Sequence, residues 1–127
     1  MNWMAVVAAA LSSFVLGGLW YSALFAKPWM QAAGLTQEQV NAGNKLMIFG
    51  GSFVLALITA ATFALFLGNV TATTGALYGA CAGLCWVTTS FGSTYLFEHK
   101  PLSLFLINGG YRTLQFTLIG WILGAWH

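Results

Sequence analysis

The stretch LSLFLINGGYRTLQFTLIGWILGAW, residues 102–126, decides the fold class of this chain. It is predominantly apolar, and it is long enough for a helix to cross a hydrocarbon layer about 30 Å thick, which takes about 20 residues. Near its middle stands Arg112. An arginine at that depth costs about 2.5–3.5 kcal/mol on insertion scales, so it indicates a buried partner or a function.

Three further apolar stretches of similar length precede it, residues 3–26, 46–67 and 75–97. Only 5% of the residues are charged and 59% are hydrophobic, whereas a soluble domain carries about 25% charged residues. Strands of a membrane barrel alternate apolar and polar residues, but runs such as residues 53–58 show no alternation. The sequence therefore predicts an all-α membrane protein, a single domain over residues 1–127 with four transmembrane helices.

The connector after the first stretch carries a helix-start signal. Thr36 and Gln39 have the spacing of a capping box, in which each side chain satisfies a backbone N–H of the other residue. A short surface helix is expected from Gln37 to about Ala42, between the first and second spans. The other two connectors, residues 68–74 and 98–101, are short.

Basic residues are distributed unequally between the two sides of the predicted bundle. Lys27, Lys45 and Lys100 all fall in or beside the first and third connectors, and the second connector has no Lys or Arg. Cytoplasmic loops carry the excess of basic residues. Both termini are therefore expected on the non-cytoplasmic side, and any homo-oligomer is expected to be parallel.

Small residues recur at the four-residue spacing that lets membrane helices approach closely. Helix-packing glycines are expected at Gly75, Gly79, Gly83, Gly120 and Gly124. This spacing serves a contact between subunits or packing inside one subunit, and the motif does not separate the two. The thin four-helix bundle favours a parallel homo-oligomer that uses Gly75, Gly79 and Gly83.

A polar face accompanies Arg112. With 100° of rotation per residue, Asn108, Tyr111, Arg112 and Gln115 fall within about 100° of arc, and the third stretch becomes polar toward its end at Glu98. These patterns predict a polar pocket open to the cytoplasm. Its candidate solute-binding residues are Arg112, Asn108, Gln115, Tyr111, Ser90, Thr94 and Glu98. In the alternative interpretation, Arg112 is structural and pairs with Glu98 or with backbone carbonyls.

Little in the sequence favours catalysis. No acidic residue lies in the middle of a span, and neither histidine has a carboxylate near it at depth. Cys81 and Cys85 are too few ligands for a metal site, and no cofactor or nucleic-acid partner is implied. The leading hypothesis is a membrane protein, not an enzyme, that binds or passes a small polar or anionic solute. The alternative is a structural or interaction subunit without transport activity.

Two signatures carry a resemblance to a known family. LWYS (residues 19–22) with FAKPWM (residues 25–30) forms the first, and YLFE (residues 95–98) with LFLINGGY (residues 104–111) forms the second. Together with the ending from Gly120 to Gly124, they resemble a family of small bacterial membrane proteins, domain of unknown function 1761. The resemblance implies a four-helix membrane fold in a prokaryote, with no established activity. The chain is expected in a bacterial inner membrane, with both termini non-cytoplasmic.

Overall fold

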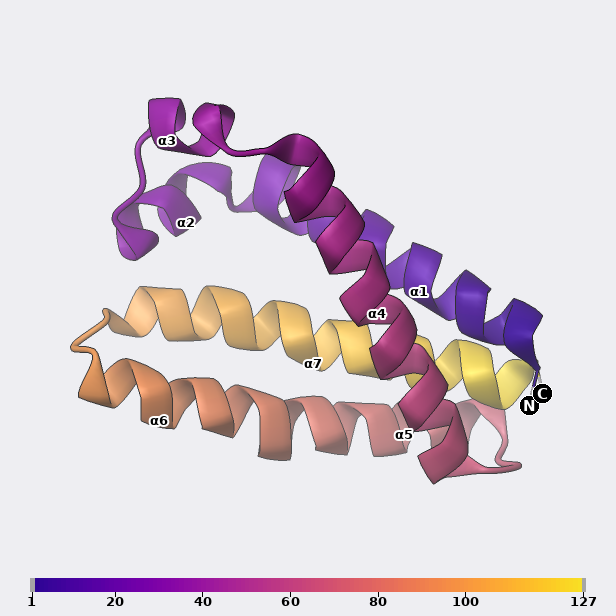
Figure 1. Cartoon of the computed structure of the whole chain (residues 1–127). Coiled ribbons are helices and arrows are strands. Elements are labelled where there is room, and N and C mark those ends of the chain that lie inside the picture. The colour runs from indigo at the N-terminus through magenta and orange to yellow at the C-terminus, as the bar shows by residue number, and fades with distance from the viewer. Residues whose placement is uncertain (1, 127) are drawn as a thin grey trace.

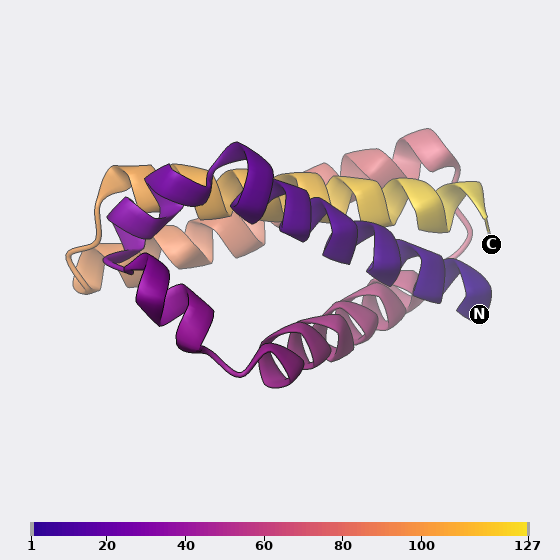
Figure 2. The same cartoon turned by 90° about the horizontal axis from the view of Figure 1, so that it is seen from above.

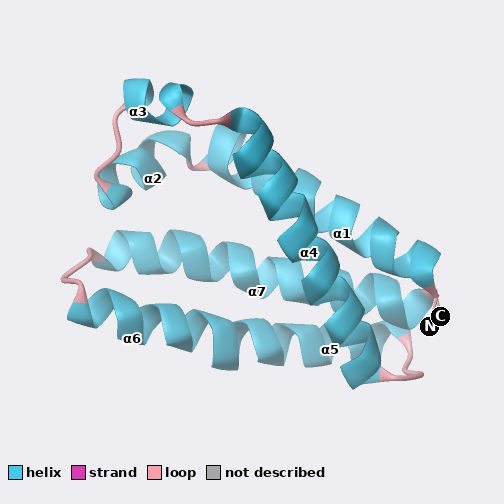
Figure 3. Cartoon of the chain, viewed as in Figure 1, coloured by secondary structure: helices cyan, strands magenta, loops and turns pink. Residues whose placement is uncertain are grey.

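The computed structural model describes residues 2–126, and every regular element within them is helical (Figure 3). The elements in chain order are α1 (Trp3–Gly18), the π-helical turn η1 (Leu19–Leu24), α2 (Ala26–Ala33), α3 (Gln37–Ala42), α4 (Lys45–Leu67), α5 (Ala72–Ala82), the π-helical turn η2 (Gly83–Thr88), α6 (Thr89–Phe97) and α7 (Leu102–Ala125). The all-α class is confirmed. Two stretches, Trp3–Leu24 and Lys45–Leu67, have the length and the apolar composition needed to cross a membrane.

Helix α7 is the centre of the arrangement. It lies between α1 on one side and the continuous rod of α5, η2 and α6 on the other, while α4 crosses obliquely (Figure 1). Both ends of the described chain lie at the same end of the molecule. Seen from above, α4 diverges from α1 toward its own N-terminal end (Figure 2). There Leu46 is 83% exposed and Met47 is 72% exposed, so this half of α4 has little protein against it.

Glycines set the closest helix contact, between α5 and α7. A Cβ added to Gly79 would collide with the carbonyl oxygen of Phe116, and one added to Gly75 would collide with that of Gly120. Each step of four along α5 is matched by a step of four back along α7, as expected for an antiparallel pair. Backbones at this distance gain van der Waals contact that larger residues would prevent. The contact continues into the start of η2, and all five expected packing glycines lie along it: Gly75, Gly79, Gly83, Gly120 and Gly124.

This placement corrects the expected use of Gly75, Gly79 and Gly83 between subunits. Their open sides are filled by α7 of the same chain, because the second glycine pair, on α7, supplies the complementary surface. An oligomer would have to use other faces.

The remaining core is built from small side chains of α1. Ala5, Ala9 and Ala10 are fully buried and pack against α4 and α7, where Ala60 and Ile119 are also fully buried. Small residues on one face let α1 approach both neighbours.

The first helix differs from its expected course over residues 3–26. Regular α-helix ends at Gly18, η1 follows, and Phe25, with φ −127° and ψ 23°, interrupts the helix before α2. The first connector thus contains the additional helix α2. Pro28 is tolerated because it lies in the first turn of α2, where backbone N–H groups have no helical partner.

The predicted surface helix is confirmed with its capping box. Helix α3 spans Gln37–Ala42, Thr36 Oγ1 accepts from Gln39 N at 3.2 Å, and Gln39 Oε1 accepts from Thr36 N at 2.9 Å. The third connector is a tight turn in which His99 adopts the left-handed conformation, with φ 57°.

Candidate functional site

Arg112 is half-buried in the middle of α7. Its Nη1 donates to Gln115 Oε1 at 2.8 Å. The guanidinium carbon lies 4.9 Å from the ring centroid of Tyr111 and 5.9 Å from that of Phe91 on α6. Both distances fall within the roughly 6 Å at which a cation is attracted to an aromatic face. The cation is thus held by one hydrogen bond and two rings.

Gln115 is a buried partner with a spare donor. Its side chain is only 4% exposed. Because arginine is a donor only, the amide must present its oxygen to Arg112, which leaves the Nε2 hydrogens to other acceptors. Among residues 2–126 no protein group accepts from that nitrogen. Since no fully inaccessible polar atom lacks a partner in this region, Nε2 must retain some accessible surface.

Tyr111 ties the Arg112 region to α1. Its side chain is 7% exposed, and its hydroxyl donates to the carbonyl oxygen of Ser13 at 3.0 Å. Gly17 makes room for it, because a Cβ there would lie 2.9 Å from the hydroxyl oxygen. The ring beside Arg112 is therefore fixed in place by a neighbouring helix.

One turn before Arg112, Asn108 joins three elements. Its Oδ1 accepts from the Tyr21 hydroxyl of η1, and its Nδ2 donates to the Tyr95 hydroxyl of α6 at 2.7 Å. The indole of Trp20 donates to the carbonyl oxygen of Ile107 at 3.0 Å. Both sides of the Asn108 amide are thus engaged within the protein.

The two π-helical turns lie on either side of this part of α7. In η1 the widened turn brings both Trp20 and Tyr21 to α7. The end of η2 brings Thr88 to α7, where its hydroxyl donates to the carbonyl oxygen of Gly109 at 3.1 Å. Single π turns inside helices are frequent at functional sites. Two of them contact the same part of α7, and this makes that part a candidate functional site.

The structure separates the seven candidate residues into three groups. Arg112, Gln115 and Tyr111 lie together, and Asn108 lies one turn away in its own network. The remaining three, Ser90, Thr94 and Glu98, are exposed on α6 and at its end. Ser90 satisfies its hydroxyl on its own helix, at the carbonyl oxygen of Trp86.

The pairing of Arg112 with Glu98 does not occur in the described structure. Glu98 caps the end of α6, whereas Arg112 lies ten residues into α7, about 15 Å along its axis. The guanidinium bonds to Gln115, in the direction away from Glu98.

The seven candidate residues named from the sequence do not include Tyr21, Tyr95 and Phe91. Tyr21 and Tyr95 are aromatic residues near span ends, where a membrane-interface belt is the usual interpretation. The family signatures could have pointed to Tyr21 and Tyr95. Tyr21 belongs to the first signature, and Tyr95 belongs to the second, together with Asn108 and Tyr111. The structure brings the two signatures into contact.

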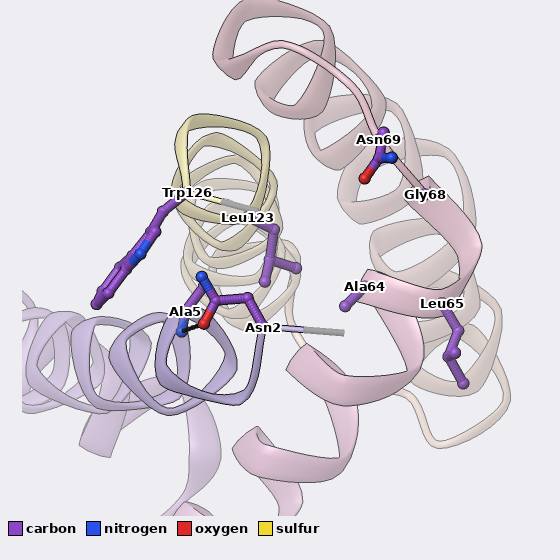
Figure 4. A pocket seen from close by; sticks show the side chains of 8 residues that line it. All are labelled: Asn2, Ala5, Ala64, Leu65, Gly68, Asn69, Leu123 and Trp126. Atoms are coloured by element: carbon purple, nitrogen blue, oxygen red, sulfur yellow. Dashed lines mark hydrogen bonds between the residues drawn. The ribbon is translucent and has the colours of Figure 1, made fainter.

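Two open hollows on the surface lie away from Arg112. One, of about 270 Å³, is walled by the start of α1, the loop after α4 and the end of α7, and includes Asn2, Asn69 and Trp126. Figure 4 shows the Asn2 side chain turned toward Ala5, where its Oδ1 accepts from the Ala5 N–H at 3.2 Å, and Leu123 beside it. The other, of about 380 Å³, is an almost wholly apolar recess beside Trp3 and Trp126. Arg112 lines neither, and by helical rise it lies about 16 Å from Leu123.

In the described region, residues 2–126, no three His, Cys, Asp or Glu side chains gather as metal ligands. No curated protein and no solved structure matches the chain. The family described as protein of unknown function (DUF1761) matches residues 4–124, which include both signatures and all of the site. This match covers nearly the whole chain, and the chain belongs to that family.

Proposed function

We propose that the chain is a four-span integral membrane protein of a bacterial inner membrane that binds or passes a small polar or anionic solute at Arg112. The four spans correspond to α1 with η1, α4, α5 through α6, and α7. Large apolar side chains face outward along them, as on a protein surrounded by lipid. The lysine distribution supports termini on the non-cytoplasmic side.

The observation that carries the solute role is the incomplete pairing of Arg112. A guanidinium has five N–H donors, and within residues 2–126 one hydrogen bond to a neutral amide is its only side-chain hydrogen bond. A structural arginine in lipid is expected to pair with a carboxylate or with backbone carbonyls. The half-buried position leaves the group reachable from the protein surface.

Direct binding measurements on purified protein test this role. Arg112→Gln should abolish solute binding while the helical content is kept. The control is Lys27→Gln, which removes the same charge from an exposed position on α2. Equal affinity in the wild type and both variants would refute the role of Arg112.

A second function, an interaction subunit without transport or catalysis, is favoured by one feature of α4. Gly50, Gly51 and Ser52 are exposed in its first half, and a Cβ added to either glycine meets nothing within 4 Å. Small residues in a membrane helix permit close packing of a neighbour. Gly51→Leu should lower the assembly state in mild detergent if another chain packs there, and an unchanged mass would remove this candidate.

A further inference from the structure

The hydrogen-bond donors of Arg112 and Gln115 restrict the charge and the shape of the ligand that this site can bind. We infer that the site takes a monocarboxylate with a compact apolar body, held between Arg112 and Gln115. This inference rests on the proposed solute role of Arg112 and specifies its chemical class.

The site offers several unpaired donors: one N–H of the Arg112 guanidinium is bonded to Gln115, and the others have no side-chain acceptor among the described residues. The Gln115 Nε2 hydrogens likewise have no side-chain acceptor among those residues. A ligand must therefore supply acceptor atoms. A carboxylate presents two coplanar oxygens that match the planar fork of a guanidinium, and a third hydrogen bond from Gln115 can reach one of them.

The surrounding charge favours a single negative charge. Arg112 is the only arginine of the chain, and the three lysines lie exposed in or beside the connectors. A dianion such as phosphate at pH 8 would keep one uncompensated charge in a region of low polarity, which is costly. A monoanion is neutralised by Arg112 alone.

The walls favour an apolar body. Phe91 has no polar atom, and the Tyr111 hydroxyl is already bonded to the Ser13 carbonyl. Nearby Asn108 is engaged on both sides by Tyr21 and Tyr95. An apolar body can therefore pack against the two ring faces that lie beside the guanidinium.

A carboxylate could come from water or from the bilayer as a fatty acid. The experiment therefore measures binding of sodium butyrate and of laurate by isothermal titration to protein in a neutral, phosphate-free detergent. Chloride, inorganic phosphate at pH 8 and the neutral isostere butyramide serve as comparison ligands. Butyrate binding identifies a water-soluble ligand, and binding of laurate alone identifies a lipid source.

Three variants separate the contributions. Arg112→Lys keeps the charge but loses the fork, and Gln115→Leu removes the third donor. Each should weaken carboxylate binding about tenfold or more, the factor that corresponds to one charge-assisted hydrogen bond. Gln115→Glu places a carboxylate against Arg112 and should abolish binding while retaining the fold, which circular dichroism checks.

The outcomes distinguish this inference from the proposed function. Binding of phosphate, chloride or butyramide as tightly as butyrate and laurate, with loss in Arg112→Lys, would overturn the carboxylate assignment and leave the solute role. No ligand whose binding depends on Arg112 would overturn both.

Discussion

The contact of Gly79 with the backbone of α7 makes a sharp prediction. Gly79→Ala adds a single methyl group at the point where it would meet the carbonyl oxygen of Phe116. A carbonyl oxygen in a helix cannot rotate away as a side chain can, so α5 and α7 must separate locally. The matched control is Gly51→Ala, at an exposed position inside α4 where the added methyl group meets nothing within 4 Å.

Two opposing effects determine how much Gly79→Ala changes the unfolding free energy. Overpacking a close contact costs about 1–3 kcal/mol, and the rigid backbone neighbour places Gly79→Ala near the upper end. Alanine is better than glycine inside a helix by about 1 kcal/mol. The net loss of unfolding free energy is then about 2 kcal/mol at Gly79, against a gain of up to about 1 kcal/mol at Gly51.

Unfolding in mixed micelles, followed by circular dichroism against the fraction of denaturing detergent, measures this difference. Gly79→Ala should unfold at a lower fraction than the wild type, and Gly51→Ala at an equal or higher one. Superimposable curves for the two variants would refute the close backbone contact between α5 and α7.

Two further predictions use the same unfolding titration in mixed micelles, and a third uses reporter proteins fused to the C-terminus. Tyr111→Phe should lose about 1 kcal/mol of unfolding free energy with the hydrogen bond to Ser13, while Tyr78→Phe, on an exposed side chain, should lose none; equal losses would contradict the assignment. His99→Gly should gain about 0.5–1 kcal/mol, because left-handed strain of about 1–2 kcal/mol is removed at some entropic cost, and a loss measured in the same titration would contradict it. A phosphatase fused to the C-terminus should be active in cells and a fluorescent protein should not, and the reverse pattern would refute the proposed orientation.

Local signals in the sequence predicted local structure well. The capping box at Thr36 and Gln39 located α3, because both of its hydrogen bonds form within one turn. The sequence also predicted that Arg112 and Gln115 lie beside each other, because residues three apart on a helix face the same way. In the structure their side chains are hydrogen-bonded.

Features that depend on other helices were not predictable in this way. The π turn η1 interrupts an apolar stretch without a local signal, and it is stabilised by distant bonds such as that from Trp20 to Ile107. Ser90 was expected to face the pocket because it is polar. A serine can instead bond to its own helix, and here its hydroxyl bonds to Trp86 and leaves the side chain exposed.

The role of Arg112 can be measured at one residue, because it is the only arginine in the chain. Growth on arginine that carries ¹⁵N only at its two Nη atoms labels this guanidinium, and solid-state NMR of the protein in bilayers then measures dipolar dephasing by a ligand. With ¹³C-carboxyl butyrate we predict dephasing that corresponds to a nitrogen–carbon distance of about 4 Å, as in a bidentate pair. Absence of dephasing by labelled butyrate or laurate, and by the ³¹P of inorganic phosphate, at saturating concentration would contradict a solute site at Arg112.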